Sequence, residues 1–275
     1  MFVTNINHLP YMKAFYSLTL LVLLLAFAPA LSAQDAATYA GYHNAITLTV
    51  GLNRGLFRDE NFSPLNYRSG GNQLGLGYVR TNKNGHRITA DVNFGLNGMS
   101  PGFELPDNLT RFQVDLSVGY LRAVSDPRSD HQNYVGVKFR SRLDLSIYAY
   151  YESVTFYALH GFEIAAETER KVANRLQLRG GASLPVFGLL SRPPYSGWDK
   201  FIADNSDNIP KVITRGDWLT IGSFLGLRGH LGLAYEAGKH WKVESRYSLA
   251  YYTTKRLDPV RMLDHTFSFN TTLNF

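Results

Sequence analysis

Alternation of apolar and polar residues runs to the very end of this chain and closes on an aromatic residue, Phe275. Between His265 and Phe275 the odd positions are apolar or threonine apart from His265, and every even position is polar. Successive side chains of a β-strand point to opposite faces, so a strand with this rhythm has one apolar face and one polar face. The segment is therefore predicted to be a strand whose two faces meet different surroundings.

The same rhythm recurs along the rest of the chain. Its clearest instance lies between Ile88 and Asn97, where even positions are apolar and odd positions are polar or glycine. The pair Asn84-Gly85 just before it is a strong signal for a tight hairpin. We predict ten strands, one at the C-terminus and the others at about 45–57, 71–82, 86–98, 109–122, 133–150, 154–168, 174–187, 218–236 and 240–254.

The N-terminal residues have the features of a secretory signal peptide. Lys13 supplies a positive charge, 18–27 is apolar, and 28–33 is rich in small residues. We expect cleavage before Gln34 and initiation at Met12, so that 1–33 is a signal peptide and 34–275 is one exported domain. The apolar stretch is too short to span a membrane comfortably as an anchor.

An export signal, an even number of alternating strands and a final strand that stops on Phe275 resemble the integral outer-membrane β-barrel proteins of Gram-negative bacteria. The resemblance names no subfamily. It implies an all-β fold, a transmembrane up-and-down antiparallel barrel in the cell outer membrane, surrounded by outer-membrane lipid. It also implies that Phe275 belongs to the signal read by the barrel-assembly machinery.

Loop lengths and aromatic positions agree with such a barrel. If the N-terminus is periplasmic, short connections are expected after even-numbered strands and longer ones after odd-numbered strands. The predicted short connections are 82–85, 123–132, 169–173 and 237–240. The predicted long ones are 58–70, 99–108, 188–217 and 255–263, and 151–153 is an exception. An aromatic girdle is expected on the outer face at the periplasmic ends, formed by Tyr78, Tyr120, Tyr235, Trp241 and Phe275.

Composition excludes several kinds of site and partner. The chain has no cysteine, which rules out disulfides, thiolate metal sites and thiol nucleophiles. The formal net charge of +6 could suit nucleic acid, but the basic residues do not cluster and the chain carries an export signal. His160, Glu163 and Glu167 have metal-ligand spacing only on a helix, and this segment is predicted to be a strand. We therefore expect neither metal, cofactor nor nucleic acid.

Ten strands enclose a narrow lumen, because eight-stranded barrels are already filled by side chains and open channels belong to much larger ones. The inward positions carry both signs of charge in similar number, and buried charges are expensive unless they are paired. We predict that ion pairs plug the lumen, formed by Asp91, Asp115, Lys138, Arg140, Arg142, Glu163, Arg179, Glu244 and Arg246. Further inward charges are expected at Arg111, Glu167, Arg228 and Lys242.

The longest predicted connection, 188–217, is the place where a ligand-binding function could concentrate. Pro193-Pro194 stiffens it, and Tyr195, Trp198 and Phe201 could bind a ligand or fold over the barrel mouth. The alternative is a variable surface loop that only covers the barrel.

The sequence favours a membrane-structural or ligand-binding barrel, which could also pass small solutes, over an enzyme. A hydrolase at the barrel rim is one alternative, with Asp264-His265 as its best pair, but adjacent strand residues point to opposite faces. His160 and His230, predicted outward and inward respectively, have no evident serine partner. The other alternative is an accessory component of an export or assembly machine. No catalytic residue and no ligand or protein partner is named.

Overall fold

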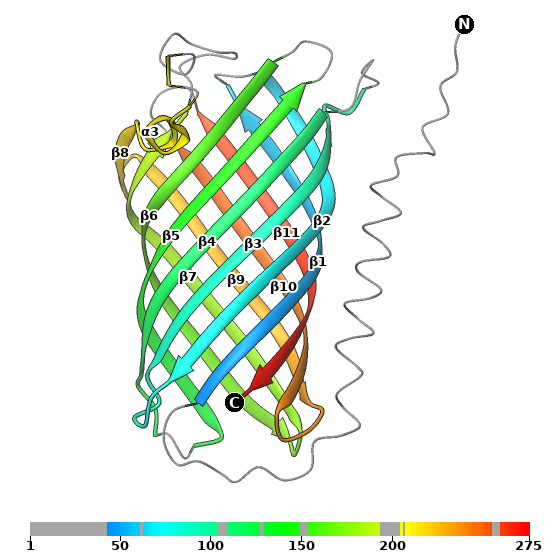
Figure 1. The fold of residues 1–275 in the computed structure, drawn as a ribbon, viewed down its shortest axis with the longest axis vertical. Helices are drawn as coiled ribbons and strands as arrows, with labels where there is room; N and C mark the ends of the chain where they lie inside the picture. The colour runs from blue at the N-terminus through cyan, green and yellow to red at the C-terminus, as the bar shows by residue number, and fades with distance from the viewer. Residues whose placement is uncertain are drawn as a thin grey trace, which may run out of the picture.

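The computed structural model is an antiparallel β-barrel (Figure 1). The residues that it describes are 43–60, 63–103, 109–126, 129–148, 153–192, 204–205, 207–254 and 259–275. The expected signal peptide 1–33, with Met12, lies outside them. The strands are β1 (His43–Asp59), β2 (Ser63–Thr81), β3 (Arg87–Ser100), β4 (Leu109–Ala123), β5 (His131–Tyr148), β6 (Ser153–Ala173), β7 (Leu176–Ser191), β8 (Asp217–Thr220), β9 (Phe224–Glu236), β10 (Trp241–Thr254) and β11 (Val260–Asn274).

Ten strands close the ring within the described ranges, in the order β6-β5-β4-β3-β2-β1-β11-β10-β9-β7, and β7 then pairs with β6. The seam between β1 and β11 is paired from Ala45–Asn274 to Asp59–Val260. Phe275 completes it, because its backbone N–H donates to the carbonyl of Asn44 and its carbonyl accepts from the Asn44 N–H, both at 2.9 Å. The predicted ten-stranded up-and-down barrel is confirmed.

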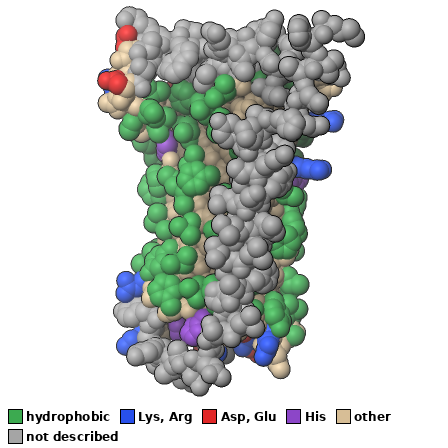
Figure 2. Space-filling view, turned by 45° about the vertical axis from the view of Figure 1, so that its right-hand side comes forward, with side chains coloured by type: hydrophobic (Ala, Val, Ile, Leu, Met, Phe, Trp, Pro, Cys, Tyr) green, Lys and Arg blue, Asp and Glu red, His purple; other side chains and the backbone are tan. Residues whose placement is uncertain are grey.

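The outer face of the barrel is apolar. Leu52, Phe94 and Leu231 are 61%, 54% and 58% exposed, and all three occupy positions predicted to face outward. Figure 2 shows apolar side chains over the middle of the wall, with Lys and Arg side chains toward its upper and lower parts. Lipid offers no partners to backbone N–H and C=O groups, so a sheet with this surface is stable in a bilayer only if it closes. No helix in the described part of the chain is long and apolar enough to cross a bilayer.

The two ends of the barrel differ. The end that carries Asn44 and Phe275, here called the terminal end, has short connections such as 82–86 and 174–175. The opposite end, here called the loop end, carries the connection 192–216. Four residues of the predicted aromatic girdle, Tyr78, Tyr120, Tyr235 and Phe275, are 36–59% exposed and lie near the terminal end.

Strands at the loop end are longer than the sequence pattern predicted. The connection predicted at 58–70 is only 60–62, because β1 continues to Asp59 and β2 begins at Ser63. Tyr67 in the extension of β2, and Phe57 at the end of the predicted first strand, point into the lumen and are 4% and 3% exposed. The strict contrast between apolar and polar faces is lost there, so periodicity could not reveal the extensions.

The predicted strand 218–236 is divided into β8 and β9 by a turn at 221–223. Pro185 on the neighbouring strand β7 explains the break, because proline has no N–H to donate to the sheet. The register between β6 and β7 also shifts there, from Phe162–Phe187 to Glu163–Pro185. The outward positions of β7 therefore move by one residue, and Phe187 is 42% exposed.

Candidate functional site

The interior of the barrel is the candidate site, because most charged residues of the strands point into it. It has four levels from the loop end to the terminal end. The first is an apolar layer, and the other three are clusters of ion pairs.

The apolar layer lies inside the barrel at the loop end. Its members come from the loop ends of ten strands, every strand except β5, and each is at most 7% exposed. They are Phe57, Tyr67, Met99, Leu109, Tyr157, Leu159, Leu190, Leu219, Phe224, Tyr252, Val260 and Met262. The sequence analysis did not anticipate this layer. The only sequence pattern that could have indicated this layer is the presence of apolar residues at inward-facing positions near the strand ends.

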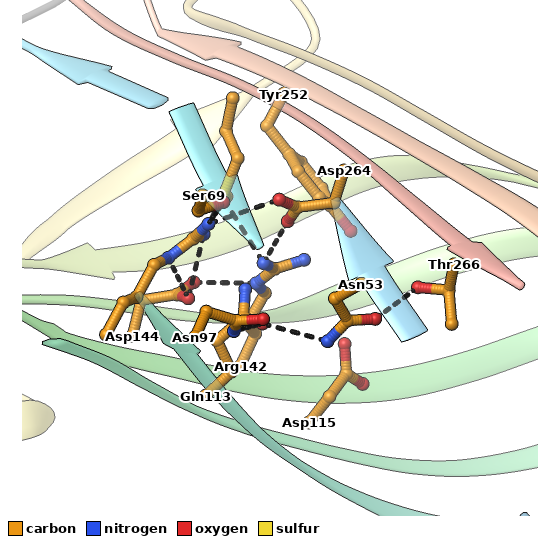
Figure 3. Close-up of polar contacts among 12 residues, drawn as sticks. Asn53, Ser69, Asn97, Gln113, Asp115, Arg142, Asp144, Tyr252, Asp264 and Thr266 are labelled. Atoms are coloured by element: carbon orange, nitrogen blue, oxygen red, sulfur yellow. Dashed lines mark hydrogen bonds and ion pairs between the residues drawn. The ribbon is translucent and has the colours of Figure 1, made fainter. Parts of the chain in front are cut away.

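Below this layer four side chains form a closed ring of opposite charges, the Arg111 cluster (Figure 3). Arg111 lies 2.9 Å from Asp144 (Nη2–Oδ1) and 3.1 Å from Asp264 (Nη1–Oδ1). Arg142 lies 2.7 Å from Asp144 (Nε–Oδ2) and forms its second ion pair with Asp264. The side chains of Arg111 and Asp144 are 0% and 2% exposed. Asp264 comes from β11 and the others from β4 and β5, so the ring spans the lumen.

Further contacts hold the two guanidinium groups of this cluster. Arg111 donates to Ser69 Oγ at 3.3 Å and to Met262 Sδ at 2.6 Å. Its guanidinium carbon lies 5.1 Å from the centre of the Phe57 ring, and that of Arg142 lies 5.7 Å from the Tyr252 ring. Such cation–π contacts strengthen when water is excluded. The apolar layer and the Arg111 cluster therefore form one continuous packed region.

The middle cluster is also charge-balanced. Arg140 contacts Asp115 at 2.5 Å (Nη1–Oδ1) and Glu163 at 3.2 Å (Nε–Oε1). Arg228 contacts Asp115 at 2.9 Å (Nη2–Oδ2), and Ser183 Oγ donates to Glu163 at 2.8 Å. The four charged residues belong to β4, β5, β6 and β9, and the pair between Arg228 of β9 and Asp115 of β4 crosses the lumen.

A small cavity adjoins the middle cluster at the bulge in β7. Arg140, Glu163 and Arg228 line its polar side, and Pro185 and Phe224 contribute to its apolar side. A space with polar walls of this kind suits an ordered water molecule.

The third cluster lies nearest the terminal end. Arg87 binds Glu169 through two hydrogen bonds of 2.9 Å, and Arg179 lies 3.2 Å from Glu169 and from Glu244. Arg246 contacts the same Glu244 at 2.7 Å. Lys138 Nζ lies 2.6 Å from Glu167 Oε1.

The predicted lumen residues differ in what they contact. Asp115, Lys138, Arg140, Arg142, Glu163, Arg179, Glu244 and Arg246 each lie within 4 Å of an opposite charge. Asp91 accepts a hydrogen bond from Ser117 Oγ at 3.2 Å and makes no ion pair with a residue that the structure describes.

Several partners were not predicted as lumen residues. Asp264 was considered only as part of a catalytic pair, yet its even position on β11 points inward with Ser268 and Asn270. Glu169 lay beyond the predicted end of its strand at 168. The pair Asp264-His265 does not form one site, because the His265 ring faces outward and hydrogen-bonds to Tyr247.

Two other kinds of site were considered in the sequence, a ligand site in the long connection and a metal site. The aromatic residues Tyr195, Trp198 and Phe201 of the long connection lie outside the described residues. No group of three metal-ligating side chains is placed to hold a metal ion among the residues described.

His160 has a serine partner, contrary to the sequence analysis. Ser141 lies directly opposite it on β5, and Ser141 Oγ is 2.8 Å from His160 Nδ1. His160 Nε2 is 3.0 Å from the carbonyl oxygen of Ile213, the last residue of the short helix α3 (Ile209–Ile213). The pairing was missed because the register between two strands cannot be read from either strand alone.

Replacing Asp264 with asparagine tests the Arg111 cluster. The change leaves Arg111 and Arg142, both buried, with only one shared carboxylate. Breaking a buried ion pair typically costs about 3–5 kcal/mol, so we expect the free energy of unfolding to fall by about that amount. Denaturant unfolding in detergent micelles measures it. The control is Asp217→Asn, which alters an exposed carboxylate on β8, and equal stability of the two variants would contradict the role given to the cluster.

No family model matches the sequence, and no curated protein matches it. Solved structures with a similar arrangement include the translocator domain of the autotransporter NalP from Neisseria meningitidis, at 14% identity and a TM-score of 0.45, covering 96% of this chain and 98% of that one. They also include an outer-membrane channel from Pseudomonas putida F1, at 7% identity and a TM-score of 0.40, covering 89% and 100%. The chain's own closed barrel and apolar outer face are those of an integral membrane β-barrel.

Proposed function

We propose that this protein is a non-conducting outer-membrane barrel with a membrane-structural or ligand-binding role that it carries out at its surfaces and not through its lumen. The observation that carries the proposal is the ring of Arg111, Arg142, Asp144 and Asp264 beneath a continuous apolar layer. A hydrated ion would have to displace both to cross the barrel.

The energetics of the ring support a permanent closure. Its two positive and two negative charges balance, and each carboxylate contacts both guanidinium groups. Removing one member from such a buried set leaves a charge without its partner, which is strongly unfavourable. Transient opening by movement of a single side chain is therefore costly. Passage of small solutes, which the sequence left open, is disfavoured for the same reason.

Ligand binding is assigned to the loop end and the outer wall. The connection 192–216 joins β7 to β8, and Tyr195, Trp198 and Phe201 within it stay our candidates for contact with a ligand. Phe275 stays our candidate for the assembly signal, and its paired backbone at the seam is consistent with a role in closing the barrel.

Conductance measurement in planar bilayers tests the proposal. The purified protein should leave the conductance equal to that of the protein-free membrane, because the apolar layer and the three clusters block ions. An open porin added to the same membranes is the positive control. Steady conductance steps that scale with the amount of this protein would overturn the proposal.

A hydrolase at the outer wall is the second candidate, and the contact between Ser141 and His160 is what favours it. The carbonyl oxygen of Ile213 can only accept a hydrogen bond, so His160 Nε2 carries the proton. Nδ1 is then the acceptor for the Ser141 hydroxyl, as in serine nucleophiles activated by a histidine base. The same bonds also anchor α3 to the outside of β6, which is a structural role that needs no catalysis.

Covalent labelling separates these two roles of Ser141. If His160 activates the serine, a fluorophosphonate probe should modify Ser141, which mass spectrometry can locate. The modification should disappear in Ser141→Ala and persist in Ser245→Ala, which removes another hydroxyl from the outer face of β10. Absence of labelling in the unaltered protein would leave the anchoring role as the only one.

A further inference from the structure

Four arginines lie on the outer face of three neighbouring strands near the loop end. Arg54 and Arg58 share the outward parity of β1 with Leu52 and Leu56, which are 61% and 48% exposed. Arg68 on β2 and Arg261 on β11 are exposed and also face outward. These four residues are called the arginine patch.

The strand register brings the four side chains together. Arg58 lies directly opposite Arg261, and Arg68 lies opposite Leu56, between Arg54 and Arg58. Diagonal neighbours on one face of a sheet are separated by about 7–8 Å, within reach of long side chains. Arg68 is thus a diagonal neighbour of both Arg54 and Arg58, and Arg261 faces Arg58, so the four long side chains form one continuous group that a ligand can contact.

The patch carries more positive than negative charge. Arg58 Nη2 lies 3.0 Å from Glu60 Oε1, which compensates one arginine. Arg54, Arg68 and Arg261 form no ion pair with any residue that the structure describes. Like charges directly opposite each other destabilise a sheet, as at Arg58 and Arg261. An anion bound from outside would remove this repulsion.

The surroundings of the patch restrict what that anion can be. Leu52, Phe267 and Phe269, which are 61%, 45% and 53% exposed, lie on the same faces toward the middle of the barrel. A lipid-facing arginine is costly at the bilayer midplane and costs little near the interface. The patch is therefore expected at headgroup level, with hydrocarbon beside the apolar residues.

We propose that the arginine patch binds the phosphate of an anionic lipid in the leaflet at the loop end. Arginine suits phosphate because its planar fork can donate two parallel hydrogen bonds. The acyl chains of the lipid lie along Leu52, Phe267 and Phe269 while its phosphate meets Arg54, Arg68 and Arg261. An amphiphile fits this arrangement of charge beside apolar surface, whereas a free phosphate would use only the arginines. The proposal makes the lipid the ligand of the outer wall, and it depends on membrane placement and not on a closed lumen.

Native mass spectrometry of the detergent-solubilised protein tests the proposal with phosphatidic acid as the probe and phosphatidylcholine as the comparison. The unaltered protein should retain phosphatidic acid in preference. The variant Arg54→Gln/Arg68→Gln/Arg261→Gln should bind it at least about tenfold more weakly, because each basic residue near the membrane surface strengthens attraction to an anionic lipid. The matched control is Arg122→Gln/Arg170→Gln, which removes two exposed, outward-facing arginines near the terminal end. This variant should retain phosphatidic acid as tightly as the unaltered protein.

Two further arms make the result decisive. Inorganic phosphate should not displace the lipid, because it lacks the acyl chains. If the triple variant fails to fold, Arg68→Gln alone should still weaken binding measurably. Unchanged lipid binding in the folded variants would overturn the proposal. So would equal retention of phosphatidylcholine, or displacement of the lipid by inorganic phosphate. None of these outcomes changes the conductance of the barrel, so the two proposals can fail separately.

Discussion

Backbone hydrogen bonding in a solvent without hydrogen-bond partners is the constraint on which this structure depends. Each unpaired backbone group in hydrocarbon costs several kcal/mol, so every strand needs two neighbours. The seam between β1 and β11 supplies the last pair, and its ladder extends to the backbone of Phe275. The break between β8 and β9 lies opposite Pro185 of β7, which has no backbone N–H to donate to a neighbouring strand.

Closure of the barrel creates a second constraint in its interior. Once the apolar side chains face lipid, the polar side chains of the same strands must face a narrow lumen, where charges need partners. The structure meets this need by joining distant strands, as when Asp264 of β11 binds Arg111 of β4. The interior thus resembles a protein core in its burial, although it is built largely from ion pairs. The outer wall differs from the interior, because the arginine patch there carries positive charge that no residue described by the structure fully balances.

Alternation in the sequence was sufficient to predict most of the strands and their faces, because side-chain parity is a local property of each strand, and the resemblance built on it predicted the barrel. It also placed Arg140, Glu163 and Glu244 in the lumen. It could not identify their partners, because the stagger between strands decides which inward residues share a level. The contact between Asp264 and Arg111 and that between Ser141 and His160 both depend on this stagger. The apolar layer escaped prediction because Phe57 and Tyr67 lie where the contrast between the two faces disappears.

Thiol accessibility tests the filled lumen most directly, since the natural chain contains no cysteine. Ser117 points inward on β4 and is 4% exposed, whereas Asn84 is exposed in the turn before β3. In lipid vesicles, Ser117→Cys should resist a charged, membrane-impermeant thiol reagent that modifies Asn84→Cys rapidly. Modification of both variants at similar rates would mean that water and solutes reach the centre of the barrel, which would contradict this account.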